Sequence, residues 1–298
     1  MSGWLRLPLF YFKCVRIMKK SVLTFSDHSR HFKDCIYVYP VVSRRSQGVS
    51  LGINLNINNA CNWRCVYCQV EGLVRGKPER IDLPRLKFEL DMMLDWIVNG
   101  QFIQEYAPVG LQRFNDICLS GNGESTLSED FVAVCEIIAE LREKYKIGTE
   151  VKTVLISNGS EILKENVQQG LKIIAAHNGE LWFKIDRANP DAINQVNQVS
   201  IDINGVIKRL QLASSLCKTY VQSCWFRVDE IEPAAELVAE FVALMVQLKP
   251  YIAGVLLYST ARNPALPEGH NISQVSPEFL TNLANQIADN GIMVKNYV

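Results

Sequence analysis

Three cysteines, Cys61, Cys65 and Cys68, stand in a C-x3-C-x2-C spacing that could hold a metal. They follow an apolar, alternating run at 51–57, which predicts a tight loop directly after a buried strand. Thiolates are soft ligands that suit an iron–sulfur cluster or a zinc ion. No fourth cysteine follows nearby, so one coordination position of such a site would stay open for a substrate or cofactor.

A second stretch with chemical potential is the turn Ser120-Gly-Asn-Gly-Glu, which follows a short apolar strand at 116–119. Its glycines, Gly121 and Gly123, let the backbone approach a ligand closely and expose its N–H and C=O groups. The Glu124 carboxylate at the end of the turn can bind an ammonium group. Such a turn alone is a weak signal, but its place one strand after the cysteines strengthens it.

Together the two stretches resemble the motifs of the radical S-adenosylmethionine (radical SAM) enzymes, over about residues 50–260. The resemblance implies that Cys61, Cys65 and Cys68 hold three irons of a [4Fe–4S] cluster. It implies that the fourth iron is chelated by the amino and carboxylate groups of SAM. The aromatic Tyr67, just before the third cysteine, fits the family position near the adenine.

The glycine turn resembles the family's "GGE" motif, which holds the amino group of SAM. The resemblance assigns that role to the backbone from Gly121 to Gly123 and to the Glu124 carboxylate. Asn122 replaces one family glycine, and Ser125 stands where many relatives have proline. The wording of both motifs is closest to a broad group of iron–sulfur oxidoreductases that includes wyosine-type tRNA synthases. We do not carry the tRNA activity over.

Polar residues at the ends of two later strands are further candidates. Ser157 and Asn158 follow a strand at 152–156, where they can point into a ligand mouth or form an ordinary Asn-Gly turn. Lys184 and Asp186 end a strand at 181–186 and face the same side of it. They can pair in a barrel interior, contact the ribose and carboxylate of SAM, or form an ion pair at a surface end.

The elements that must position these residues alternate between strands and helices. Strands are predicted at 51–57, 116–119, 152–156, 181–186, 220–228 and 253–258, with amphipathic helices between them. This is the βα pattern of a parallel sheet with right-handed crossovers. The fold class is therefore α/β, and the resemblance sharpens it to a partial (β/α)6 TIM-like barrel. A short strand at 35–39, ended by Pro40, is expected before it.

Four regions are expected along the chain. Residues 1–17 are interpreted as an N-terminal extension outside the fold and 18–50 as a lead-in. Residues 51–260 form the core barrel, and 261–298 form a C-terminal helix and tail. Cys118, Cys135, Cys217 and Cys224 fall within apolar patterns and are interpreted as core packing.

The composition sets the expected surroundings of the protein. The 298 residues carry 31 basic and 31 acidic side chains, so a nucleic-acid partner stays open but receives no support. No run approaches the roughly 20 apolar residues of a membrane span. An iron–sulfur protein needs a reducing compartment, which predicts the cytoplasm. A reductant such as flavodoxin or ferredoxin is implied by the resemblance.

The sequence therefore favours an enzyme with a [4Fe–4S] cluster that cleaves SAM to a 5′-deoxyadenosyl radical. That radical would abstract hydrogen from a substrate that the sequence does not reveal. One alternative is an activase that places a glycyl radical on a partner protein. Another is a non-catalytic metal-binding module, such as a structural zinc knuckle, although zinc sites of that kind normally close with four ligands.

Overall fold

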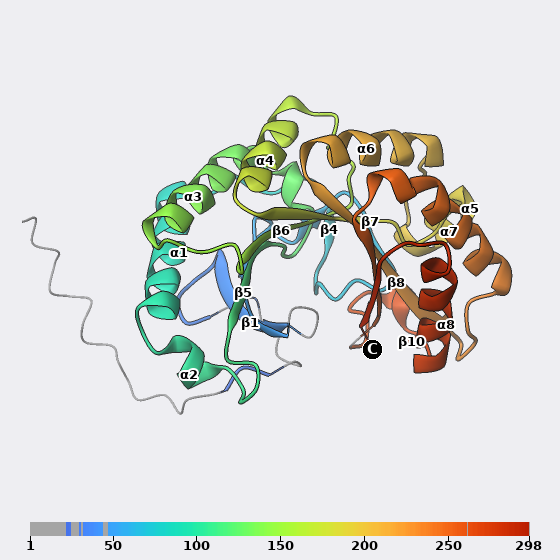
Figure 1. Ribbon diagram of the computed structural model, residues 1–298, viewed down its shortest axis with the longest axis horizontal. Coiled ribbons are helices and arrows are strands. Elements are labelled where there is room, and N and C mark those ends of the chain that lie inside the picture. The colour runs from blue at the N-terminus through green and yellow to red at the C-terminus, as the bar shows by residue number, and fades with distance from the viewer. Residues whose placement is uncertain (1–21, 25–29, 31, 44–46, 261, 298) are drawn as a thin grey trace, which may run out of the picture.

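The structure is a computed structural model that describes residues 22–24, 30, 32–43, 47–260 and 262–297. The predicted N-terminal extension at 1–17 lies outside these residues. The described part of the protein is organised around one curled sheet of nine strands. This sheet forms an open arch with helices along its outer side (Figure 1).

Six neighbouring strands of the sheet run parallel and correspond to the six strands that the sequence predicts. They are β2 (Gly48–Ile53), β5 (Phe114–Leu119), β6 (Lys152–Ser157), β7 (Gly179–Lys184), β8 (Lys218–Val228) and β9 (Gly254–Ser259). Parallel neighbours require long crossovers, and each crossover here contains at least one helix. Because all six strands point the same way, their carboxyl ends meet at one edge of the sheet. The predicted α/β class is confirmed.

Three additional strands widen the sheet beyond the predicted six. β1 (Val38–Ser43) pairs antiparallel with β2, β10 (Ile272–Gln274) pairs antiparallel with β8, and β11 (Val294–Tyr297) pairs parallel with β9. A separate two-stranded ribbon, β3 (Ala60–Cys61) and β4 (Val74–Arg75), braces the cysteine loop.

The predicted end of the first short strand is wrong. Pro40 lies inside β1, opposite Leu51 of β2, rather than after its last residue. Proline lacks a backbone N–H and is tolerated on edge strands, because one side of such a strand has no partner strand. β1 is an edge strand, so Pro40 does not stop it.

The helices cover the outer side of the arch (Figure 1). They are α1 (Leu83–Val98), α2 (Phe102–Tyr106), α3 (Phe131–Lys144), α4 (Glu165–Ala176), α5 (Pro190–Asn197), α6 (Ile203–Leu216), α7 (Ala235–Leu248) and α8 (Pro277–Ala288). Single turns of 3-10 helix occur at η2 (Ser125–Leu127), η3 (Lys249–Tyr251) and η4 (Pro267–Gly269). As far as the chain is described, no helix combines the length and apolarity needed to cross a membrane.

Local sequence signals explain where the main helices begin. The Asp82 side chain accepts a hydrogen bond from Arg85 N at the start of α1, and Asp202 caps α6 in the same way. The buried stripe of α1 contains Leu86, Leu90 and Met93, which recur at helical spacing. These stripes and the outer face of the sheet enclose the main hydrophobic core. The inner face of the arch is therefore left to line a site.

Candidate functional site

The three cysteines line one cavity at the carboxyl edge of the sheet. It has a volume of about 250 Å³ and also receives Tyr67, the glycine turn and the ends of β6 and β7. Thus the structure brings together Cys61, Cys65 and Cys68 with Tyr67, Gly121, Asn122, Gly123, Glu124, Ser157, Asn158 and Lys184. Of the predicted site residues, Asp186 lies just behind the wall of this cavity, with its side chain fully buried.

Two distant parts of the chain hold the cysteine loop in place. On one side the end of α5 accepts backbone hydrogen bonds, from Val66 N to Val196 O at 2.8 Å and from Arg64 N to Asn197 O at 3.2 Å. On the other side Ala265 N donates to Cys68 O at 2.8 Å. The folded chain therefore holds the cysteine loop from two sides.

The segment 262–270 adds further contacts on that second side. The Arg64 guanidinium pairs with Glu268 at 2.8 Å, and Arg262 donates to the Gln69 side chain at 2.6 Å. Leu266 packs against Val70 and Leu73 in a small apolar cluster that also contacts Cys61 and Cys68. Apolar surroundings of this kind limit the access of water to a metal site.

Burial controls the protonation of the three thiols. It raises the pKa of Cys61 to about 11 and that of Cys65 to about 12, and it raises the pKa of Cys68 as well. Metal ligation requires thiolates, so binding of a metal group must release protons from this loop.

The arrangement of the thiols bears on which metal group they suit. A tetrahedral zinc ion needs its sulfur ligands about 2.3 Å from one point. Among the described residues, no group of three or more His, Cys, Asp or Glu side chains, the three cysteines included, is gathered to hold a single metal ion. Cysteines that hold a cluster bind different iron atoms and need no common point. Three half-buried thiols around one cavity are a soft donor set that fits an iron–sulfur cluster.

The glycine turn packs directly against the residues that precede the cysteine loop. A Cβ at Gly123 would lie 2.1 Å from Ala60 O, and a Cβ at Gly121 would lie 2.3 Å from Asn54 Oδ1. Asn54 Oδ1 also accepts from Asn122 N at 3.0 Å. Any side chain at these two positions would push the turn away from the loop. The glycines thus let the turn and the cysteines share one cavity.

Glu124 joins the glycine turn to the end of β6. Glu124 is 4% exposed, and its carboxylate accepts from Ser157 Oγ at 2.8 Å, Asn158 N at 2.6 Å and Thr126 Oγ1 at 2.6 Å. Burial raises the pKa of Glu124, although these donors oppose the shift. Ser157 and Asn158 are therefore tied to Glu124 and are not merely an Asn-Gly turn.

Asp186 lies at the centre of a buried polar network. Its carboxylate pairs with Lys184 Nζ at 3.0 Å and accepts from Tyr67 Oη at 2.5 Å and Cys224 N at 2.8 Å. Lys184 also donates to Tyr258 Oη at 2.7 Å. The side chains of Lys184 and Asp186 are 11% and 0% exposed, so they form an interior pair and not a surface-end ion pair.

A second cavity of about 330 Å³ lies deeper within the arch and shares Lys184, Tyr258 and the two glycines with the first. Trp182 and Gln222 line it. They stand two residues before Lys184 and Cys224 on β7 and β8, so they face the same side one layer further in.

The walls of this deeper cavity are more polar than a packed barrel interior, which normally holds branched apolar side chains. Ser50 Oγ donates to the Asp116 carboxylate, and both residues line the cavity. Gln222 is 1% exposed, and within the described chain its Nε2 has no hydrogen-bond partner. A buried amide without a partner is unfavourable, which suits a wall that binds a polar ligand.

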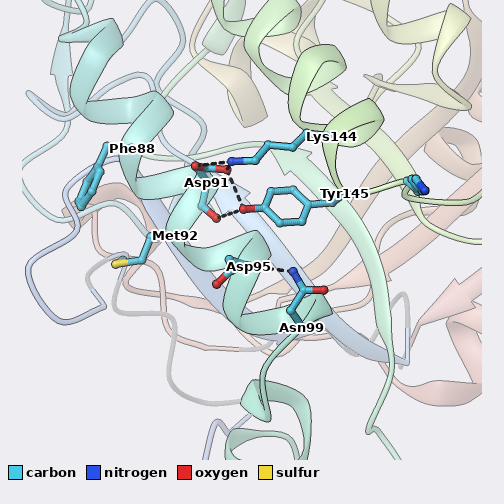
Figure 2. A pocket seen from close by; sticks show the side chains of 8 residues that line it. Phe88, Asp91, Met92, Asp95, Asn99, Lys144 and Tyr145 are labelled. Carbon is cyan, nitrogen blue, oxygen red and sulfur yellow. Dashed lines mark hydrogen bonds and ion pairs between the residues drawn. The ribbon is translucent and has the colours of Figure 1, made fainter. Parts of the chain in front are cut away.

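A larger hollow of about 590 Å³ lies on the outer surface between α1 and α3, away from the cysteines (Figure 2). There Asp91 accepts from Lys144 Nζ at 2.6 Å and from Tyr145 Oη at 2.7 Å, and Asp95 accepts from Asn99. These polar groups satisfy one another across the floor of the groove. We assign the hollow to helix packing.

Several known proteins share sequence with this chain, two of them from Helicobacter pylori, and no model of a known protein family matches it. A UPF0026 protein of Helicobacter pylori strain J99 is 25% identical over 234 residues, which cover 77% of this chain and 69% of the relative. A UPF0026 protein of H. pylori strain 26695 is 29% identical over 171 residues, covering 57% of this chain and 48% of that protein.

Among solved structures, the chain resembles Streptococcus suis SuiB, which was crystallised bound to S-adenosylmethionine. The TM-score is 0.51 at 14% identity, and the match covers 84% of this chain and 47% of SuiB. At this identity the likeness concerns the fold. The chain therefore shares an α/β half-barrel fold with SuiB and spans about half of its length.

Several site residues escaped sequence reasoning. Asn54 and Asn56 precede the cysteines and bind the glycine turn, since Asn56 Nδ2 donates to Ala60 O and Glu124 O. The run Asn54-x-Asn56 after an apolar strand was a signal that could have indicated them. Asn197 also contacts the site, but nothing in its local sequence distinguishes it from other helical asparagines.

The four cysteines interpreted as core packing are all buried, as expected. Cys135 and Cys217 lie in the core between the sheet and the helices. Cys224 and Cys118, however, also line the first and the second cavity.

Proposed function

We propose that this protein is a radical SAM enzyme, in which Cys61, Cys65 and Cys68 hold a [4Fe–4S] cluster and SAM occupies the adjoining cavity. The observation that carries the proposal is the meeting of three half-buried thiols and the Gly121–Glu124 turn in one cavity. The fold shared with SuiB, which was crystallised with SAM, supports it. The six parallel strands with their crossovers would then form the (β/α)6 half-barrel.

The chemistry that the two bound groups supply is reductive cleavage of SAM to methionine and a 5′-deoxyadenosyl radical, which abstracts a hydrogen atom from the substrate. The chain itself binds, orients and excludes water. The glycine turn offers backbone groups and the Glu124 carboxylate to an ammonium. Tyr67 presents an aromatic ring at the wall, held by its hydrogen bond to Asp186.

The second cavity supplies the substrate compartment in this proposal. It shares Lys184 and Tyr258 with the first as lining residues, so a substrate bound there would lie next to SAM. The Ser50–Asp116 pair, the Gln222 amide and the Trp182 ring suit a polar substrate with a flat or apolar part. An external reductant, such as flavodoxin or ferredoxin, would supply the electron.

Anaerobic reconstitution with iron and sulfide tests the proposal. The expected product binds four irons per chain, shows iron–sulfur charge-transfer absorbance, and releases 5′-deoxyadenosine when it is reduced in the presence of SAM. The Cys65→Ala variant should lose both properties. Cys135→Ala is the matched control, because Cys135 is buried in the core away from the cavity and should leave both unchanged.

Two results would overturn the proposal. Tight binding of zinc without assembly of a cluster would indicate a non-catalytic metal-binding module. A reduced cluster that yields no 5′-deoxyadenosine from SAM would exclude the radical chemistry.

A further inference from the structure

The carboxyl end of α5 is the part of the chain that contacts both the cysteine loop and the Asp186 network. The helix begins at a capped turn, where Asn189 Oδ1 accepts from Ala192 N at 2.8 Å. It ends at Asn197, followed by Gln198 in the left-handed region. The backbone carbonyls of Val196 and Asn197 accept from the cysteine loop. This fixes the last turn of α5 against Cys65.

The side chain of Asn197 is 1% exposed and bridges two acceptors. Its Nδ2 donates to Cys65 Sγ at 3.2 Å and to Asp186 Oδ2 at 2.8 Å. An amide nitrogen carries two hydrogens, so both bonds can form at once. The Asp186 bond holds the amide in the orientation that aims its other hydrogen at the sulfur.

Cys65 differs from the other two cysteines in the kind of donor that it faces. Backbone N–H groups, including those of Trp63 and Val70, lower the pKa of Cys61 and Cys68 against the larger effect of burial. Cys65 receives a side-chain donor from a distant helix. A backbone donor is present whatever the residue, whereas the Asn197 amide is a property of this sequence that substitution can remove.

A hydrogen bond to a ligand sulfur stabilises negative charge on the cluster. A reduced cluster carries one more negative charge than an oxidised one, so such a bond favours reduction and raises the potential. We propose that Asn197 is a positioning residue that raises the reduction potential of the cluster through Cys65 and couples Cys65 to Asp186. This inference rests on the proposed function, because it requires the cluster.

The test compares Asn197→Leu with the parent protein after both are reconstituted with iron and sulfide. Leucine is close to asparagine in size but has no donor. An EPR-monitored redox titration should show the reduction equilibrium constant falling about tenfold, a shift of ~59 mV to lower potential for a one-electron couple. Iron content should stay at the parent value, since the three thiolates are retained.

Asn194→Leu is the matched control, because Asn194 lies one turn earlier on α5 and is exposed. Its potential should equal that of the parent. Should Asn197→Leu fail to fold or to assemble a cluster, Asn197→Ala removes the same donors with less steric change and decides the matter. Urea unfolding of each variant reports any loss of stability separately from the potential.

The outcomes distinguish this inference from the proposed function. If the parent protein assembles no cluster, the proposed function fails. If the parent assembles one and both Asn197 variants keep its potential, the positioning role of Asn197 is refuted and the proposed function stands. A shift of the same size in Asn194→Leu would also refute it, because the effect would then belong to α5 as a whole.

Discussion

The buried pair of Lys184 and Asp186 gives the sharpest prediction for stability. The Asp186 carboxylate is fully buried and accepts from Tyr67, Asn197 and the Cys224 backbone besides pairing with Lys184. Asp186→Asn removes the charge and turns one oxygen into a donor that faces donors. Removing one partner of a buried pair costs about 3–5 kcal/mol. We expect a loss of about that size in the free energy of unfolding.

A double-mutant cycle separates the pair from its surroundings. Lys184→Met alone should cost less than Asp186→Asn, about 1–3 kcal/mol, because the Asp186 carboxylate keeps its three other donors. The double variant should be more stable than the sum of the single changes predicts, by about 1–3 kcal/mol. Urea unfolding of the four proteins supplies all the values. Strict additivity, or a loss below about 1 kcal/mol for Asp186→Asn, would refute the assigned network.

The same pair predicts a dependence on pH. Burial raises the pKa of Asp186, but Lys184 and the hydrogen bonds outweigh it and hold the pKa below its usual value. A carboxylate with a lowered pKa stabilises the fold above its unfolded pKa, and this contribution is lost as the pH falls through the folded pKa. The difference in stability between the parent and Asp186→Asn should therefore be largest near neutral pH and shrink in acid.

Two further changes follow from the packing. Gly123→Ala would place its Cβ 2.1 Å from Ala60 O. We expect it to lower the free energy of unfolding by about 1–3 kcal/mol and to weaken SAM binding in equilibrium dialysis. Gly76→Ala is the control and should change neither, because no atom lies within 4 Å of the added Cβ. Asp91→Asn in the outer groove should lower the free energy of unfolding by only about 0.5–1 kcal/mol at neutral pH. Its partner Lys144 is about half exposed, and solvent weakens an ion pair of that kind. Burial raises the pKa of Asp91, but Lys144 and Tyr145 lower it by more, so the pKa lies below its usual value. The stability lost in Asp91→Asn should therefore shrink when thermal unfolding is measured at acid pH. A loss of the same size at every pH would contradict that account.

The strand pattern and the two motifs were predictable because they depend on local sequence. Short apolar runs located all six parallel strands, and a glycine turn after a strand is visible without a structure. That Lys184 and Asp186 face one side followed from strand geometry. The burial of Lys184 and Asp186 could not be predicted in this way. It depends on Tyr258, Tyr67 and the end of α5, which lie far away in the sequence.

The short helix α5 shows why the rest of the site was missed. Its eight residues begin with Pro190 and follow the capping Asn189, a pattern typical of a helix start. Nothing in them predicts that the helix ends against the cysteine loop, since that contact joins Asn197 to Cys65 across 132 positions. The prediction that the first short strand ends at Pro40 was wrong for a related reason. An edge strand tolerates a proline that a central strand does not, and the sequence alone does not show which strand lies at the edge.

The segment 262–270, which holds one side of the cysteine loop, is synthesised long after the loop itself. The loop is synthesised early, but Arg64 pairs with Glu268 across 204 positions and Gln69 binds Arg262 across 193. Contacts between such distant positions form late in folding, because a long stretch of chain must first be ordered. While the ribosome is still extending the chain, the three thiols lie on a loop that lacks one of its two supports. The cavity that the three thiols line is therefore fully enclosed only after nearly the whole polypeptide has emerged.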